Sequence, residues 1–158
     1  MQVLLFEDDS RLDLLPFTYT CPLFDLRVGI GTLREKWQRQ LHQHPGSFVA
    51  GPRQVVFADY ELDVPALFIN GKFLPDEALL NLILEDLHED EAVQTPQGEL
   101  LAFRGLPREF QELPAGHIRV DDLAHSHSFH IHDTSEPLAI RHFTDLFRLN
   151  GAILRRDF

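Results

Sequence analysis

Several features that would point to particular protein classes are scarce in this sequence. It has one cysteine, Cys21, so no disulfide can form within the chain, and this composition suits a reducing compartment. Basic residues number 14 against 25 acidic ones, and the resulting net charge of −11 argues against binding nucleic acid through a basic face. No apolar run approaches the roughly 20 residues that a membrane span needs. For residues 1–158 we therefore expect a single cytoplasmic domain that binds neither nucleic acid nor membrane.

The first two thirds of the chain alternate between apolar runs and helical patterns. Val3–Phe6 and Ala66–Asn70 are short continuous apolar runs, as buried strands have. Thr32–Leu41 has apolar residues every four positions and begins with a capping-box spacing, so it is predicted to be helical. Asp76–Leu87 follows a proline and carries acids in its first turn, which also predicts a helix. Buried strands that alternate with helices predict an α/β fold.

The other predicted elements have weaker patterns. Gln54–Ala58 is predicted to be a strand, and Ser128–His132 a last strand. Glu91–Thr95 and Glu99–Arg104 flank a Pro-Gln-Gly turn and predict a hairpin. Leu138–Asp157 is expected to be mostly helical.

Polar segments follow both buried strands, at the edge where open α/β sheets bind their ligands. Arg11 offers a planar fork of donors suited to phosphate, and Ser10 with nearby backbone N–H groups could add more. The alternative is a surface crossover whose acids are merely solvated. The candidate residues of this edge are Asp8, Asp9, Ser10, Arg11, Thr18, Thr20, Asn70, Gly71 and Lys72.

A histidine-rich stretch lies near the end of the sequence. On a strand, His130 and His132 would share one face and could offer two imidazoles to zinc. Two ligands do not complete a zinc site. The alternative, which we favour, is an exposed strand face without a metal.

The opening segment resembles the start of sugar-1-phosphate nucleotidyltransferases. Arg11 matches the arginine of their phosphate loop, Leu14–Thr18 their Leu-x-Pro-Leu-Thr segment, and Cys21-Pro22 their Lys-Pro. Farther on, Leu67–Leu79 resembles the family's strand that ends in Gly-Asp, with Asn70-Gly71 at its tip.

The resemblance is closer to a divergent bacterial branch, the uridyltransferase-like proteins of Bacteroidetes. Thr18–Thr20, Arg27–Ile30 and Thr32–Trp37 follow that branch almost letter for letter. The tail from Thr144–Phe147 to Asp157-Phe158 resembles its ending. In that branch a left-handed β-helix acyltransferase domain usually follows, so such a domain, or a second copy of the chain, is an expected partner.

The resemblance implies a GT-A-like, Rossmann-like domain of reduced size, with a mostly parallel sheet flanked by helices. It implies transfer of a nucleotidyl group from a nucleoside triphosphate to a sugar 1-phosphate, with Mg²⁺ as the cofactor. Arg11 would be the catalytic residue that holds phosphate, and the other candidate residues of the edge would bind substrate.

Three positions depart from the family pattern. Glu7–Ser10 replaces the glycine-rich loop, Cys21 stands at the catalytic lysine, and Lys72 stands at the metal-binding aspartate. Asp8, Asp9 and Asn150 are then the candidates for a metal. Because a neutral thiol cannot replace an ammonium, a second hypothesis is open: a degenerate domain that binds nucleotide or sugar phosphate, or assembles with a β-helix partner, without turnover.

Overall fold

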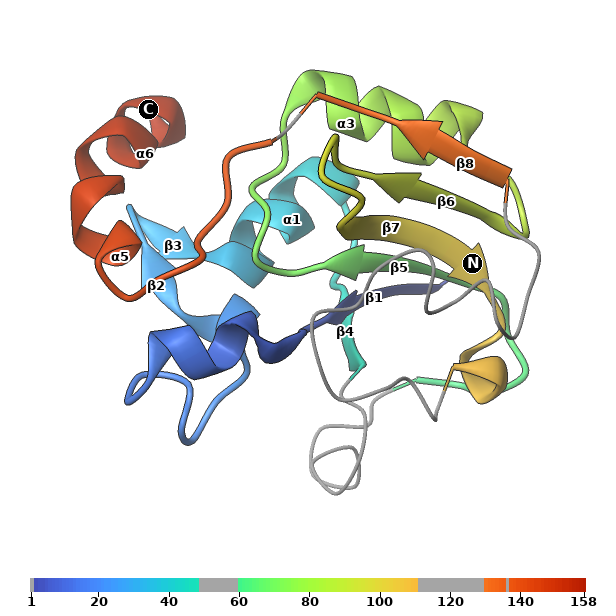
Figure 1. The fold of residues 1–158 in the computed structure, drawn as a ribbon, viewed down its shortest axis with the longest axis horizontal. Helices are drawn as coiled ribbons and strands as arrows, with labels where there is room; N and C mark the ends of the chain where they lie inside the picture. Colours follow the sequence, from blue (N-terminus) through green and yellow to red (C-terminus); the bar gives the residue numbers. More distant parts are fainter. Residues whose placement is uncertain (1, 49–59, 111–129, 136) are drawn as a thin grey trace.

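The computed structural model describes residues 2–48, 60–110, 130–135 and 137–158. Its centre is a six-stranded sheet of order β4-β1-β5-β7-β6-β8 (Figure 1). The strands are β1 (Gln2–Phe6), β4 (Gly46–Phe48), β5 (Ala66–Asn70), β6 (Glu91–Gln94), β7 (Leu100–Gly105) and β8 (His130–Asp133). The pairings of β1 with β4 and β5 are parallel, as is that of β6 with β8, whereas β7 runs antiparallel to both of its neighbours. The predicted α/β fold with a mostly parallel sheet is confirmed.

Helices and a small hairpin surround this sheet. The helices are α1 (Leu33–Leu41), α3 (Glu77–Asn81) with a following π-helical turn (Leu82–Asp86), α5 (Asp145–Arg148) and α6 (Asn150–Asp157). Three 3₁₀ turns are η1 (Asp9–Leu14), η2 (Leu23–Asp25) and η5 (Pro107–Glu109). The hairpin consists of β2 (Arg27–Val28) and β3 (Gly31–Thr32). No helix in the described part of the chain has the length and apolar character needed to cross a membrane.

Local sequence signals explain where two of the predicted helices, α1 and α3, begin. The Thr32 side chain accepts a hydrogen bond from the Glu35 backbone N–H, and the Glu35 side chain accepts one from the Thr32 N–H. This reciprocal capping box satisfies backbone donors that the first turn of α1 would otherwise leave unpaired. At α3, the Asp76 side chain accepts from the Leu79 N–H at 2.8 Å.

Apolar side chains cover both faces of the sheet. One face carries the larger core, in which Leu5, Ile69 and Leu101 pack with Trp37 of α1 and Ile153 of α6. The other face carries a cluster rich in phenylalanine: Phe6, Phe48, Phe68, Phe103 and Phe110. In this cluster the Phe68 and Phe103 rings stack with their centroids 4.4 Å apart.

The carboxyl ends of β1 and β5 point to the same edge of the sheet, which we call the carboxyl edge. Beyond this edge lie η1, the β2–β3 hairpin and the helices α5 and α6 (Figure 1). Segments from the beginning, middle and end of the sequence therefore meet there. Because β7 runs antiparallel to β5, the segment after β7 leaves from the opposite edge.

The sequence-based predictions differ from the structure in three places. Gly46–Phe48, for which no strand is predicted, forms β4 beside β1. The predicted tail helix begins only at Asp145, because Ala139 bridges to Phe73 and residues 142–144 form a bend and a turn before α5. The helix predicted at Asp76–Leu87 keeps α-helical hydrogen bonding only through Asn81. The predicted strand Gln54–Ala58 lies outside the described residues.

Candidate functional site

A cluster of buried polar side chains lies at the carboxyl edge, where β1 and β5 end. Lys72 is completely buried, and its Nζ donates to Asp8 Oδ2 at 2.8 Å and to Ser10 Oγ at 3.0 Å. The same Nζ also donates to Glu99 Oε1. Asn70 joins the cluster by donating from Nδ2 to Asp8 Oδ2 at 3.1 Å. We call Asp8, Ser10, Asn70, Lys72 and Glu99 the Lys72 cluster.

The electrostatics of this cluster are set by burial and by Lys72. Burial by itself would raise the pKa of Asp8, because desolvation disfavours the carboxylate. The Lys72 charge, together with hydrogen bonds from Lys72 and Ser10, outweighs that effect, so the pKa of Asp8 is lowered overall. Asp8 is therefore an anion held by an internal cation. A buried charge that is paired in this way costs far less than an isolated one.

Glu99 and Arg141 connect this cluster to solvent, and sequence reasoning missed both. Glu99 Oε1 contacts Lys72, while Glu99 Oε2 accepts from Arg141 Nη1 at 2.8 Å. The Arg141 side chain is 40% exposed. The one available signal was Lys72 itself, because a lysine directly after a buried strand requires an acidic partner.

The η1 segment carries the predicted phosphate-binding residue. Asp8 caps η1 by accepting from the Ser10 N–H at 2.9 Å, which fixes the start of the turn. Arg11 follows within η1; its side chain is 32% exposed, and its Nε lies 4.0 Å from Glu7 Oε1. The buried Thr18 donates from its hydroxyl to the Arg11 carbonyl oxygen, whereas Thr20 is exposed. The Arg11 backbone is thus anchored on both sides, while its guanidinium reaches solvent.

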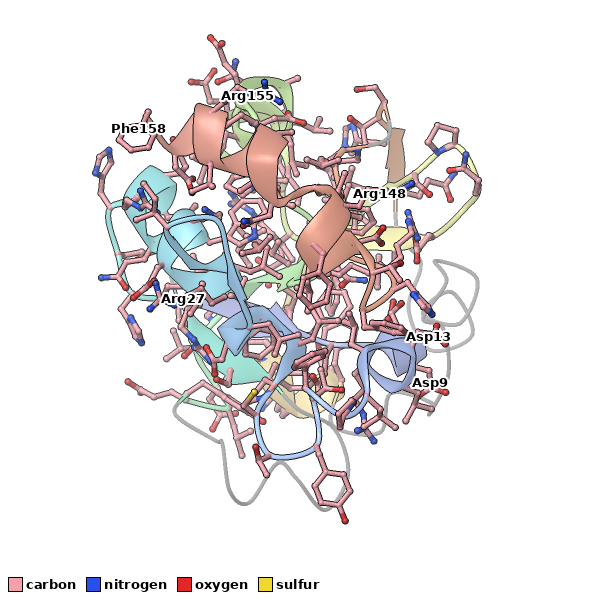
Figure 2. The ribbon with its side chains drawn as sticks, turned by 90° about the vertical axis from the view of Figure 1, so that its left-hand side faces the viewer. Asp9, Asp13, Arg27, Arg148, Arg155 and Phe158 are labelled. Carbon is pink, nitrogen blue, oxygen red and sulfur yellow. The ribbon has the colours of Figure 1, made fainter. Side chains whose placement is uncertain are left out.

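Figure 2 looks onto this edge, with α5 and α6 in front. It shows Asp9 and Asp13 on η1 to one side and Arg27 of β2 to the other. Asp9, a predicted substrate or metal contact, is half-buried at the start of η1. The acidic side chains of η1 therefore lie on the same rim as Arg11.

Asn70 and Gly71, the predicted tip of β5, lie beneath this rim. Asn70 is 1% exposed and also donates to the Leu100 carbonyl at 3.2 Å. A Cβ on Gly71 would lie 2.5 Å from Phe24 Cδ1, so only glycine fits against that ring. The structure brings together Asp8, Ser10, Asn70, Gly71 and Lys72. These residues are buried within or beneath η1, and their polar side chains bond to one another.

A second group of contacts joins the β2–β3 hairpin to the end of the chain. Gly29 N–H donates to Asn150 Oδ1 at 2.8 Å, and Ile30 N–H donates to Asp157 Oδ2 at 2.9 Å. Lys36 Nζ donates to both Asp157 oxygens at 2.6 Å. We call Gly29, Ile30, Lys36, Asn150 and Asp157 the hairpin–α6 interface. It gives a structural role to the motifs on which the resemblance to the divergent branch rests.

Two of the three metal candidates, Asp8 and Asn150, have side-chain oxygens that are already used within the protein, while Asp9 as a metal ligand stays a prediction. Both oxygens of Asp8 accept hydrogen bonds, and its Oδ2 already faces the Lys72 ammonium. Asn150 Oδ1 is used by the Gly29 N–H. Among the described residues, no three His, Cys, Asp or Glu side chains are grouped as a metal site would require. The Lys72 ammonium therefore lies against the Asp8 oxygen that a metal ion would need.

The predicted zinc pair has one member whose contacts can be described. His132 Nε2 lies 3.1 Å from Glu91 Oε2, across the parallel pairing of β8 with β6. The side chain of His130 lies outside what the structure describes. Zinc binding by this pair stays a prediction.

Comparison with known proteins adds one match. A family model described as sugar nucleotidyl transferase matches residues 3–158, which is nearly the entire chain. No curated protein matches it.

Proposed function

This chain belongs to the sugar nucleotidyl transferase family, and we propose that it transfers a nucleotidyl group from a nucleoside triphosphate to a sugar 1-phosphate. The family match over residues 3–158 is the observation that carries this proposal. In the reaction, a phosphate oxygen of the sugar attacks the α-phosphorus, and the bond to the β-phosphate breaks. Diphosphate leaves with the electron pair of that bond.

We assign the direct phosphate contact to Arg11. Its guanidinium is the partly exposed cation on η1, and its planar fork matches two phosphate oxygens. Arg11 would offset the negative charge that develops as the oxygens of both substrates converge. Asp9, Thr18 and Thr20 lie on the same loop, and we expect them to shape the substrate contact.

The Lys72 cluster would serve this site as a set of positioning residues. Asp8 caps η1, and Lys72 with Asn70 ties Asp8 to the end of β5. Gly71, beside Asn70, packs closely against the Phe24 ring. We expect these contacts to hold η1, and with it Arg11, in one position. A cation that is already positioned contributes to catalysis because it need not reorient during the reaction.

The test measures diphosphate release with a panel of nucleoside triphosphates and sugar 1-phosphates, with Mg²⁺ in the buffer. We expect turnover with at least one pair. Arg11→Gln should lower kcat/KM by about 10- to 100-fold, the loss of one charge-assisted hydrogen bond. Arg108→Gln is the matched control, because Arg108 follows β7 at the opposite edge of the sheet and should leave turnover unchanged. Absence of diphosphate with every pair would remove the proposal.

A second candidate function is a domain that binds or assembles without turnover. It is favoured by Lys72, whose ammonium is buried and neutralised by two carboxylates instead of facing a substrate. An aromatic surface near η1 suits assembly, since Phe17 is 43% and Phe147 69% exposed with ring centroids 6.5 Å apart. Thermal stabilisation by a nucleotide without turnover would support a binding domain. A dimer that shows neither stabilisation by nucleotide nor turnover would support assembly with a second copy, whereas a complex with a β-helix acyltransferase would support that partner.

A further inference from the structure

A pocket of about 190 Å³ opens between α1 and α6, beside the segment that follows β5. Its polar lining is Lys36, Arg39, Gln40, Arg156 and Asp157. None of these residues belongs to the Lys72 cluster or to the η1 segment. The pocket is therefore built separately from the candidate nucleotidyl-transfer residues.

The sign of the charge in this pocket is opposite to that of the chain. The protein has a formal net charge of −11, yet the lining holds three basic side chains and one acidic side chain. Lys36 and Asp157 neutralise each other through two contacts of 2.6 Å. Arg39 and Arg156 then give the lining a net positive charge. On a strongly acidic protein, such a patch concentrates small anions locally.

The donors in the pocket are already partly oriented. Arg156 Nη2 donates to the Pro75 carbonyl at 3.1 Å, and Arg39 Nε lies 3.4 Å from the Glu35 carbonyl, to which it donates. Each of these bonds uses one N–H of a guanidinium that carries five. Anchoring through one N–H fixes the fork and reduces the entropy lost when a ligand binds to the others.

The size of the pocket restricts the ligand. Sites for drug-sized molecules usually measure about 300–1,000 Å³, so about 190 Å³ fits a small group and not an entire nucleotide sugar. Two guanidinium forks match the several oxygens and the double negative charge of a phosphoryl group. We propose that this pocket is a binding site for a phosphoryl anion, held by Arg39 and Arg156 with Gln40 as a neutral donor.

The experiment measures calorimetrically the binding of three probes: inorganic phosphate, diphosphate and a sugar 1-phosphate. The probes are compared at equal ionic strength, and the series is repeated at higher salt. These arms distinguish a free anion from the phosphate of a larger ligand, and chloride serves as the reference anion. We expect millimolar or tighter binding of at least one probe, weakening as salt is raised. Arg39→Gln and Arg156→Gln should each weaken it by about tenfold.

Arg155→Gln is the matched control. Arg155 is the neighbour of Arg156 on α6, is exposed, and does not line the pocket (Figure 2). This variant removes the same overall charge but leaves the pocket lining unchanged, so it should bind the probe as the wild type does. Thermal unfolding without ligand checks that each variant is folded. Since all three arginines are exposed, we expect little change in that measurement.

Three results would overturn the proposal: no binding of any probe, equal weakening by Arg155→Gln, or full binding by the Arg39→Gln/Arg156→Gln double variant. Arg11→Gln separates this site from the proposed reaction, because Arg11 does not line the pocket. This variant should lower turnover and still bind the anion in the pocket. Failure of the reaction therefore leaves the pocket proposal standing, and failure of the pocket leaves the reaction standing.

Discussion

Replacing Lys72 with methionine tests whether the buried ammonium holds the carboxyl edge together. Methionine has a similar length but no charge, so Asp8 would stay buried after losing its cation. Removing one partner of a buried ion pair costs about 3–5 kcal/mol of unfolding free energy. This loss is a large part of the roughly 5–15 kcal/mol that stabilises a typical domain. Urea denaturation at pH 7 should therefore show a large decrease in the midpoint.

The pH dependence makes this prediction more specific. In the wild type the pKa of Asp8 is lowered, so its stabilising contribution exists above the unfolded value of about 3.9 and disappears as pH falls through the folded pKa. Without Lys72, burial dominates and raises that pKa, so the variant gains from protonation of Asp8. The difference in unfolding free energy between the two proteins should therefore shrink as pH is lowered from neutral toward about 4.

Arg108→Met is the control for this experiment. Its ion pair with Asp63 spans 2.9 Å, but the two side chains are 57% and 79% exposed. Removing this surface cation should cost only about 0–1 kcal/mol. If Lys72→Met costs no more than Arg108→Met, or if the cost does not change with pH, the reasoning about the Lys72 cluster is refuted.

Three further predictions concern the hairpin and the helices. Gly29→Ala should lower the unfolding free energy by about 1–3 kcal/mol, because Gly29 has a φ of +68° and a Cβ would lie 2.4 Å from Asp157 Oδ2. The control Gly151→Ala places its Cβ in open space on α6 and should raise the unfolding free energy by about 0.5–1 kcal/mol. Equal effects of the two variants in urea denaturation would contradict this account. Thr32→Ala removes the α1 capping box and should lower the unfolding free energy by about 1 kcal/mol, whereas an unchanged urea midpoint would show that the cap contributes nothing. Burial alone would raise the pKa of Asp157, but hydrogen bonds from Lys36 and the Ile30 N–H outweigh that effect, so the pKa is lowered overall. The stability that the Asp157 carboxylate contributes is therefore lost as pH falls through the folded pKa. Asp157→Asn should then show a shallower loss of stability on acidification than the wild type, and parallel pH profiles would count against the predicted role of this carboxylate.

Elements specified by their own residues could be predicted from the sequence. The Thr32–Glu35 spacing marks the start of α1 because both partners of the capping box lie within one turn. The runs at Val3–Phe6 and Ala66–Asn70 identify β1 and β5 because strands buried on both faces are continuously apolar. In each case the signal is local.

Elements specified by distant partners could not be predicted in this way. Gly46–Phe48 becomes β4 only because β1 offers it a parallel edge, and its three residues carry no strand pattern of their own. The candidate site shows the same limit. The sequence predicts Asn70 and Lys72 to lie at the carboxyl edge, but the buried ammonium of Lys72 is paired partly with Glu99, 27 positions later along the chain.

The attachment of the hairpin to Asp157 has a consequence for protein synthesis. β2 and β3 contain two residues each, too few to form a stable hairpin alone. Their fixed geometry depends on a carboxylate that the ribosome adds 127 residues after Ile30. The hairpin therefore cannot reach its final shape until Asp157 has been synthesised, although its own residues are translated well before that carboxylate.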